Sequence, residues 1–132
     1  MRVVGAVILN QEKILVAQRA RGALAGFWEF PGGKVESNES DTQALLREID
    51  EELAISIQIK DKLGEFDHHY PGGYLLLVIY IAHAATVSFT TRDHQDAKWV
   101  QFSELSSLQM APADIPVLPE LEKWLKSNGL LP

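Results

Sequence analysis

The sequence predicts an α+β fold in which a mixed β-sheet is sandwiched between α-helices. Two observations predict this class. Runs of β-forming residues lie on both sides of a long helical segment, and an amphipathic helix ends the chain. No internal repeat, low-complexity tract or linker interrupts the 132 residues. We therefore expect residues 1–132 to form a single domain.

The first part of the chain has the pattern of a β-hairpin followed by a loop and a short strand. The loop contains several Gly and Ala residues, and a Pro-Gly-Gly sequence stops the short strand. The expected elements are strands at 3–9 and 14–18, a turn at 10–13, a loop at 19–26 and a strand at 27–30.

A helix is expected next, because Ser40 and Gln43 have the spacing of a capping box. Leu45, Ile49 and Leu53 then recur on one helical face. Further β-rich runs lie at 55–60, 75–82, 86–89 and 98–102, followed by a short helical turn at 103–108. Asp114 or Pro116 opens the last helix, whose apolar side consists of Val117, Leu118, Leu121, Trp124 and Leu125.

Composition narrows the class of protein. Hydrophobic residues make up 46% and charged residues 23% of the chain, as in ordinary globular proteins. There is no cysteine, which excludes disulfides and thiolate metal sites. Twelve Lys and Arg stand against eighteen Asp and Glu, and this acidic balance argues against binding to a nucleic acid polymer. Without a signal peptide or an apolar membrane span, we expect a cytoplasmic protein.

Three carboxylates are crowded on the first helix. At 100° per residue, Glu48, Glu51 and Glu52 fall within an arc of about 100° beside the apolar stripe. Like charges at these spacings destabilise a helix, and partial burial raises the cost. Such a cluster is often only a solvated acidic face, but here a Pro31-Gly32-Gly33 turn and Glu39 precede it. Mg²⁺ would relieve the repulsion, because it binds carboxylates and substrate phosphates together.

This segment resembles the Nudix box, G-x5-E-x7-R-E-U-x-E-E-x-G-U, in which U is a bulky aliphatic residue. Residues 33–55 match every fixed position except the last glycine, which is Ala54. In the family that glycine ends the helix, and alanine can do so at some cost in backbone strain. The match continues at 28–36, at Trp99 and at 111–116, which resemble MutT-type nucleoside triphosphate pyrophosphohydrolases. The run at 111–116 is most similar to the branch that acts on CTP or 8-oxo-dGTP.

The resemblance implies a Nudix fold and a Mg²⁺-dependent hydrolysis, with Mn²⁺ as a possible substitute, that gives a nucleoside monophosphate and pyrophosphate. It implies that Glu48, Glu51 and Glu52 hold the metal with the carbonyl oxygen of Gly32. Arg47 would hold the glutamates by charge-assisted hydrogen bonds, while Gly33 and Glu39 would support the site.

Three further residues are candidates for the site, and two of them, Asp93 and Arg19, follow from the same resemblance. Asp93 lies six residues before Trp99, where relatives carry a glutamate. The general base is expected to be either Asp93 or one of the box glutamates. An ordinary loop acid is the alternative. Arg19 and Lys34 are candidate phosphate-binding residues, although solvent-exposed cations would have the same appearance.

Asp114 aligns with an asparagine that reads the base in MutT relatives. An ionised carboxylate only accepts hydrogen bonds, which suits the amino group of cytosine, whereas a protonated one could also donate and fit an oxidised purine. The alternative is that Asp114 is simply the N-cap of the last helix. Phe30 and Tyr74 are candidates for stacking on the base, although aromatic residues at strand positions more often belong to the core. The four histidines His68, His69, His83 and His94 receive no role.

Two other functions remain as hypotheses. One keeps the hydrolysis but changes the substrate to ADP-ribose or a dinucleoside polyphosphate, although marks for these substrates are absent. The other is a nucleotide-binding module without turnover, although such proteins commonly lose box glutamates. The cellular role would be either sanitation of the nucleotide pool, which protects DNA, or pyrimidine turnover. We expect the protein to be a monomer or a homodimer.

Overall fold

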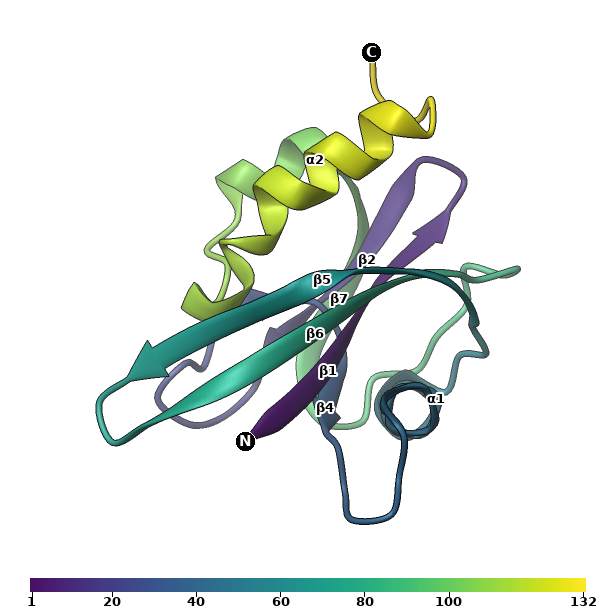
Figure 1. Cartoon of the computed structure of the whole chain (residues 1–132). Coiled ribbons are helices and arrows are strands. Elements are labelled where there is room, and N and C mark those ends of the chain that lie inside the picture. The colour runs from purple at the N-terminus through teal and green to yellow at the C-terminus, as the bar shows by residue number, and fades with distance from the viewer.

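The computed structural model describes residues 1–132 and has the expected α+β class (Figure 1). Seven strands, two α-helices and two short 3-10 helices follow one another along the chain. They are β1 (Arg2–Asn10), β2 (Lys13–Arg19), β3 (Trp28–Glu29), β4 (Gly32–Lys34), α1 (Asp41–Leu53), β5 (Gln58–Tyr70), β6 (Gly73–His83), β7 (His94–Gln101), η1 (Phe102–Ser107), η2 (Pro112–Asp114) and α2 (Val117–Ser127).

The sheet is mixed because β1 runs parallel to β6 and antiparallel to its other neighbours. The main strand order is β3-β2-β1-β6-β5, while β4 pairs with β1 and β7 pairs with β2. Along β1, Val3 to Gly5 pair with β4, and Ile8 to Asn10 pair with β2. Strand β4 is therefore fixed against the central strand β1, and it lies beside the middle of α1, near Arg47 and Glu48 (Figure 1).

The two faces of the sheet bury two separate cores, one under each α-helix (Figure 1). Side chains of β1 alternate between them: Val4, Ala6 and Ile8 face α1, and Val7 and Leu9 face α2. A fully buried aliphatic side chain contributes roughly 1.5–3 kcal/mol. The core under α1 includes Leu45, Ile49 and Leu53, and the core under α2 includes Val117, Leu121 and Leu125.

The ends of α1 follow the local signals in the sequence. The Ser40 hydroxyl accepts from the backbone N–H of Gln43, and the Gln43 side chain accepts from the Ser40 N–H, so the capping box is present. Ala54 ends the helix in the left-handed conformation, with φ 52°. Alanine therefore takes the backbone position of the expected glycine at a cost of roughly 1–2 kcal/mol.

Two strand predictions are wrong. Residues 86–89 form no strand, and β5 continues to Tyr70 although only 55–60 were expected. The second part of β5 lies at the edge of the sheet and is polar, so its alternation is weak. The last helix opens at Pro116, one of the two expected positions, so the alternative in which Asp114 is its N-cap is excluded. No helix combines the length and the apolar character needed to cross a bilayer.

Candidate active site

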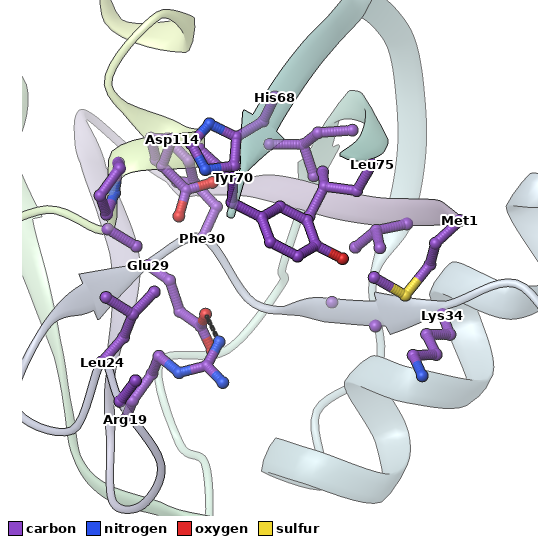
Figure 2. Close-up of a pocket in the computed structure, with 18 of the residues that line it drawn as sticks. Met1, Arg19, Leu24, Glu29, Phe30, Lys34, His68, Tyr70, Leu75 and Asp114 are labelled. Atoms are coloured by element: carbon purple, nitrogen blue, oxygen red, sulfur yellow. Dashed lines mark hydrogen bonds and ion pairs between the residues drawn. The ribbon is translucent and has the colours of Figure 1, made fainter. Parts of the chain in front are cut away.

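A cavity of about 940 Å³ opens between the Gly32–Lys34 strand, the loop after β2 and the tip of the β5–β6 hairpin. Figure 2 shows its lining, with the Asp114 carboxyl pointing inward and Arg19 paired with Glu29. Eight of the candidate site residues line this cavity. They are Arg19, Phe30, Gly32, Gly33, Lys34, Glu52, Asp93 and Asp114. Residues from six different elements and loops thus meet around one space.

The two glycines are required by close packing. A Cβ atom on Gly32 would lie 1.9 Å from the carbonyl oxygen of Val4, and one on Gly33 would lie 2.3 Å from Cδ of Glu48. No side chain fits at position 32, where the neighbours are backbone atoms, and a side chain at position 33 would displace the carboxylate of Glu48. The turn can therefore lie directly against the carboxylate of Glu48.

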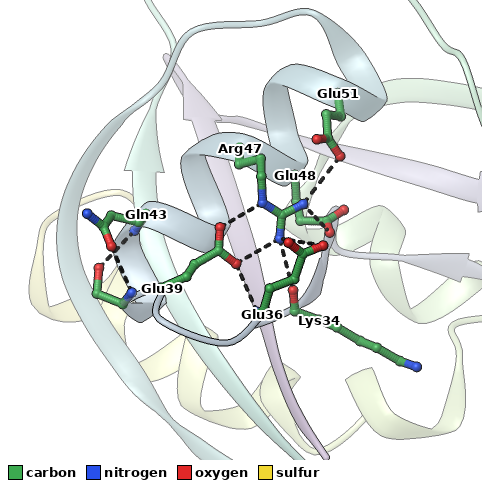
Figure 3. Close-up of polar contacts among 8 residues, drawn as sticks. Lys34, Glu36, Glu39, Gln43, Arg47, Glu48 and Glu51 are labelled. Atoms are coloured by element: carbon green, nitrogen blue, oxygen red, sulfur yellow. Dashed lines mark hydrogen bonds and ion pairs between the residues drawn. The ribbon is translucent and has the colours of Figure 1, made fainter.

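Arg47 lies outside the cavity and organises the carboxylates on one side of α1 (Figure 3). Its Nε and Nη2 donate to the two oxygens of Glu39 at 2.7 and 2.8 Å. Its Nη1 donates to Glu48 at 2.9 Å and to Glu51 at 3.3 Å. Its Nη2 also donates to the carbonyl oxygen of Lys34 at 3.1 Å. One guanidinium thus ties the box glutamates to the glycine turn.

Glu39 is held as a carboxylate by these contacts. The hydrogen bonds from Arg47, and then the backbone N–H of Glu36, lower the pKa of Glu39 to about 2. Glu39 thus links Arg47 to the backbone of Glu36, while its role in supporting the site stays a prediction.

Glu52 has the opposite environment. Its side chain is only 13% exposed, and its Oε2 atom is buried without a hydrogen-bond partner. Burial, followed by the charges of Glu48 and Glu29, raises the pKa of Glu52 to about 9. A buried carboxyl oxygen that lacks a donor, beside other carboxylates, fits a divalent cation that prefers oxygen ligands.

The three box glutamates do not converge on one point in the structure. No three acidic or imidazole groups together form a complete set of metal ligands. Arg47 draws the carboxylates of Glu48 and Glu51 toward itself, whereas Glu52 faces the cavity. Glu51 is 58% exposed at its side chain, so it has room to rotate. A metal ion bound here would compete with Arg47 for the carboxylates of Glu48 and Glu51.

Glu29 and His94 join this site although the sequence analysis gave them no role. The Nε2 of His94 lies 2.9 Å from Oε2 of Glu29, whose other oxygen accepts from Arg19 at 3.1 Å. Because a carboxylate only accepts, Nε2 of His94 is the donor. The Nδ1 of His94 is buried without a partner, 3.9 Å from Oε2 of Glu52. These contacts form a chain from Arg19 through Glu29 and His94 to Glu52.

Local signals for these two residues existed but were weak. Glu29 directly precedes the Phe30-Pro31 stop, and His94 directly follows Asp93. Only the pairing of β2 with both β3 and β7 brings them together. Asp93 itself is 67% exposed at the cavity rim, with Oδ1 3.6 Å from Nη2 of Arg21.

Asp114 lies in the apolar part of the cavity, at the end of η2. It is only 5% exposed, and Phe30 beside it is 4% exposed. Burial, and then the charge of Glu29, raises the pKa of Asp114 well above its ordinary value. A neutral carboxyl both donates and accepts. Tyr74 is exposed, stacks on His69 and does not line the cavity, so its expected position is wrong; Tyr70 lines the cavity in its place.

Comparisons with known proteins identify the family of the chain. The NUDIX domain matches residues 1–121. The chain is 38% identical over 119 residues to the CTP pyrophosphohydrolase of Escherichia coli (strain K12), across 89% of this chain and 88% of that protein. It is 30% identical over 123 residues to the 8-oxo-dGTP diphosphatase of Haemophilus influenzae, across 92% and 90% of the two proteins.

A solved structure shows the same fold. The crystal structure of a MutT Nudix hydrolase from Burkholderia pseudomallei superposes with a TM-score of 0.82 at 30% identity, covering 90% of this chain and 95% of that one. The chain therefore belongs to the Nudix hydrolase family. Since the family match ends at residue 121, the assignment of residues 1–132 to one domain stays a prediction.

Proposed function

We propose that this protein is a Mg²⁺-dependent hydrolase that converts a (deoxy)nucleoside triphosphate to the monophosphate and pyrophosphate, with Mn²⁺ as a substitute. One observation carries the proposal: a single cavity joins the carboxyl of Glu52, whose Oε2 has no hydrogen-bond partner, to the buried carboxyl of Asp114. The first suits a cation and phosphates, and the second suits a base. The names of the two relatives, which refer to CTP and 8-oxo-dGTP, support this substrate class.

Glu48, Glu51 and Glu52 would hold the metal, with the carbonyl oxygen of Gly32 as a further ligand. Bound there, a divalent ion would neutralise negative charge on the phosphate oxygens. Arg47 holds the side chains of Glu48 and Glu51 beside the Gly32–Lys34 segment by charge-assisted hydrogen bonds, so it positions these two oxygen ligands.

Arg19 and Lys34 are the phosphate-binding residues of the proposal, because both line the cavity that Glu52 faces. The hydrogen bond from Arg19 to Glu29 fixes the guanidinium group and leaves other N–H donors of Arg19 available for phosphate oxygens. Asp93 is the proposed general base, with a box glutamate as the alternative. It would orient the water that attacks an internal phosphorus of the triphosphate.

Asp114 and Phe30 would bind the base. A neutral Asp114 carboxyl offers its C=O to the amino group of cytosine and its O–H to the adjacent ring nitrogen. The same pair of groups fits the N7–H and O6 of an 8-oxopurine, whereas ordinary guanine presents two acceptors at those positions. Cytosine nucleotides are the first choice and oxidised purine nucleotides the second.

We place this activity in the cytoplasm. Its proposed role is sanitation of the nucleotide pool, which protects DNA. The proposed enzyme is a single-domain protein that is monomeric or homodimeric. The net charge of −6 favours a small nucleotide as the partner over a nucleic acid polymer. It also gives no support for association with an anionic membrane surface.

The test is pyrophosphate release with Mg²⁺ from CTP, dCTP, 5-methyl-dCTP, dGTP and 8-oxo-dGTP, with chelator and the Glu51→Gln variant as controls. The proposal expects a cytosine or 8-oxo nucleotide to lead by kcat/KM, with no release in chelator. Equal rates on all five would remove the role of Asp114. Silence across the panel would contradict triphosphate hydrolysis and shift attention to ADP-ribose or to binding without turnover.

A further inference from the structure

The C-terminal end of α1 presents four backbone carbonyl groups that have no partner further along the helix. They belong to Asp50, Glu51, Glu52 and Leu53. The backbone N–H of Ala54 donates to the carbonyl of Asp50 at 2.9 Å. The left-handed turn at Ala54 then leads the chain away from the helix axis, so the other three carbonyls need donors from elsewhere.

The irregular segment before β7 supplies all three donors. The backbone N–H of Thr90 donates to the Leu53 carbonyl at 2.8 Å. Arg92 donates twice, from its backbone N–H to the Glu52 carbonyl at 3.1 Å and from Nη1 to the Glu51 carbonyl at 3.3 Å. Every terminal carbonyl of α1 is therefore paired, three of them with residues about forty positions later in the chain.

The charge of Arg92 matters at this place. The C-terminus of a helix carries partial negative charge. Here the last turn also carries the acidic residues Asp50 and Glu51, and it has no basic residue. The guanidinium of Arg92, bound to the Glu51 carbonyl, supplies the missing positive charge.

This contact links two parts of the proposed catalytic site. Asp93 directly follows Arg92, and His94 is bonded to Glu29. The chain on both sides of Asp93 is thus anchored, before it to the end of the Nudix helix and after it to the cavity wall.

We propose that Thr90 and Arg92, from a distant loop, act as a cap for the terminal carbonyls of α1 beyond its C-cap residue Ala54, and that Arg92 is a positioning residue that fixes Asp93 relative to Glu51 and Glu52. Its catalytic consequence rests on the proposed function, whereas the cap itself does not. The segment that sequence periodicity mistook for a strand at 86–89 leads directly into this cap.

The cap is tested by amide hydrogen exchange of the whole protein, followed by NMR without metal or nucleotide. The amides of Thr90 and Arg92 should exchange at least about tenfold more slowly than that of Thr91, which donates to no protein group. Arg92→Met should raise the exchange rates of Thr90 and Arg92 toward that of Thr91. Lys123→Met, which removes an exposed positive charge on α2, should leave them unchanged.

The positioning role is tested by steady-state kinetics on the nucleotide that the wild type prefers. Arg92→Met should lower kcat about fivefold while KM changes less than about twofold, because Arg19, Lys34 and Asp114 are untouched. Arg92→Lys should recover most of kcat, since an ammonium group restores the charge and a donor. Lys123→Met should match the wild type.

Each result decides one part of the proposal. Equal exchange at Thr90, Thr91 and Arg92 would overturn the cap. Slow exchange with an unchanged kcat in Arg92→Met would overturn the positioning role, as would an equal loss in Arg92→Lys. If the wild type hydrolyses no triphosphate, the proposed function fails, and the exchange pattern still decides whether the cap exists.

Discussion

The acidic residues in and just before α1 have two kinds of surroundings, which differ in the sign of the nearest charges. Glu39, Glu48 and Glu51 share the guanidinium of Arg47, which lowers the pKa of Glu39 to about 2 (Figure 3). Glu52 is buried beside other acids with one oxygen unpaired, and its pKa rises to about 9. Residues one helical turn apart thus experience opposite electrostatic conditions.

This difference separates a supporting structure from a binding site. A fully hydrogen-bonded polar network makes the local structure rigid and unique. A buried carboxyl without a partner costs stability, and such groups are retained where a ligand completes them. Arg47 and Glu39 therefore build the frame of the site, and Glu52 is the position at which a cation would restore the missing contact.

The largest effect is expected for Glu52→Gln. The amide cannot take the charge of a metal-binding carboxylate, so kcat should fall by about 1,000-fold or more. The metal-free variant should be at least as heat-stable as the wild type, because an unfavourable buried acid is removed. Pyrophosphate release and thermal unfolding measure the two changes. A variant that retains activity would show that Glu52 belongs to the supporting frame.

Arg47→Ala should have the next largest effect. It leaves Glu39, Glu48 and Glu51 without their shared cation, so kcat should fall about 10- to 100-fold. Unlike Glu52→Gln, this variant should also unfold at a lower temperature, since the glycine turn loses its link to α1 through the Lys34 carbonyl. Loss of activity at an unchanged unfolding temperature would argue that Arg47 contacts substrate.

A matched pair of variants tests the chain from Glu52 to Arg19. The amide nitrogen of Gln reaches the position of Nε2 in His94, whereas that of Asn does not. His94→Asn should therefore free Glu29, disturb Arg19 and raise KM about tenfold, while His94→Gln should stay within about threefold of the wild type. Equal KM values for the two variants would remove His94 from the support of Arg19.

The smallest effect is on how the stability of the metal-free protein depends on pH. The Glu39 pair stabilises the fold above the ordinary pKa of 4.5, and this contribution is lost as the pH falls through about 2. Glu52 behaves oppositely: its contribution is complete below 4.5 and is lost as the pH rises toward about 9.

The two variants Glu39→Gln and Glu52→Gln separate these contributions in denaturant unfolding. Glu39→Gln should be less stable than the wild type at neutral pH, with a difference that shrinks in acid. Glu52→Gln should be more stable at neutral and alkaline pH, with a difference that vanishes in acid. Parallel curves for the two variants would mean that the two groups of carboxylates do not differ.

Local patterns in the sequence predicted α1 well. Its start depends on the Ser40–Gln43 capping box, and its buried face depends on the spacing of Leu45, Ile49 and Leu53. Both signals act within a few residues. The arc of Glu48, Glu51 and Glu52 beside that face follows from the same helical geometry. The close approach of Glu48 to Gly33 also requires the pairing of β4 with β1.

Strands were predicted less well because their partners are distant. The polar part of β5 is a strand only because β6 lies beside it at the edge of the sheet. Residues 86–89 have β-forming side chains, yet they find no partner strand, and the chain continues into the cap of α1. Hydrogen-bond partners that lie far apart along the chain leave little local signal.

By itself, the sequence determined the family, the helix that carries the box glutamates and the need for glycine at the turn, since each depends on residues near one another in the chain. Only the tertiary structure decided which acidic side chains are paired with a cation and which are buried without one. The pairing of β2 with β3 and β7 brings Glu29 and His94 to Arg19, and the packing around η2 buries Asp114. Charge and burial depend on every neighbour in space, and those neighbours come from distant parts of the chain.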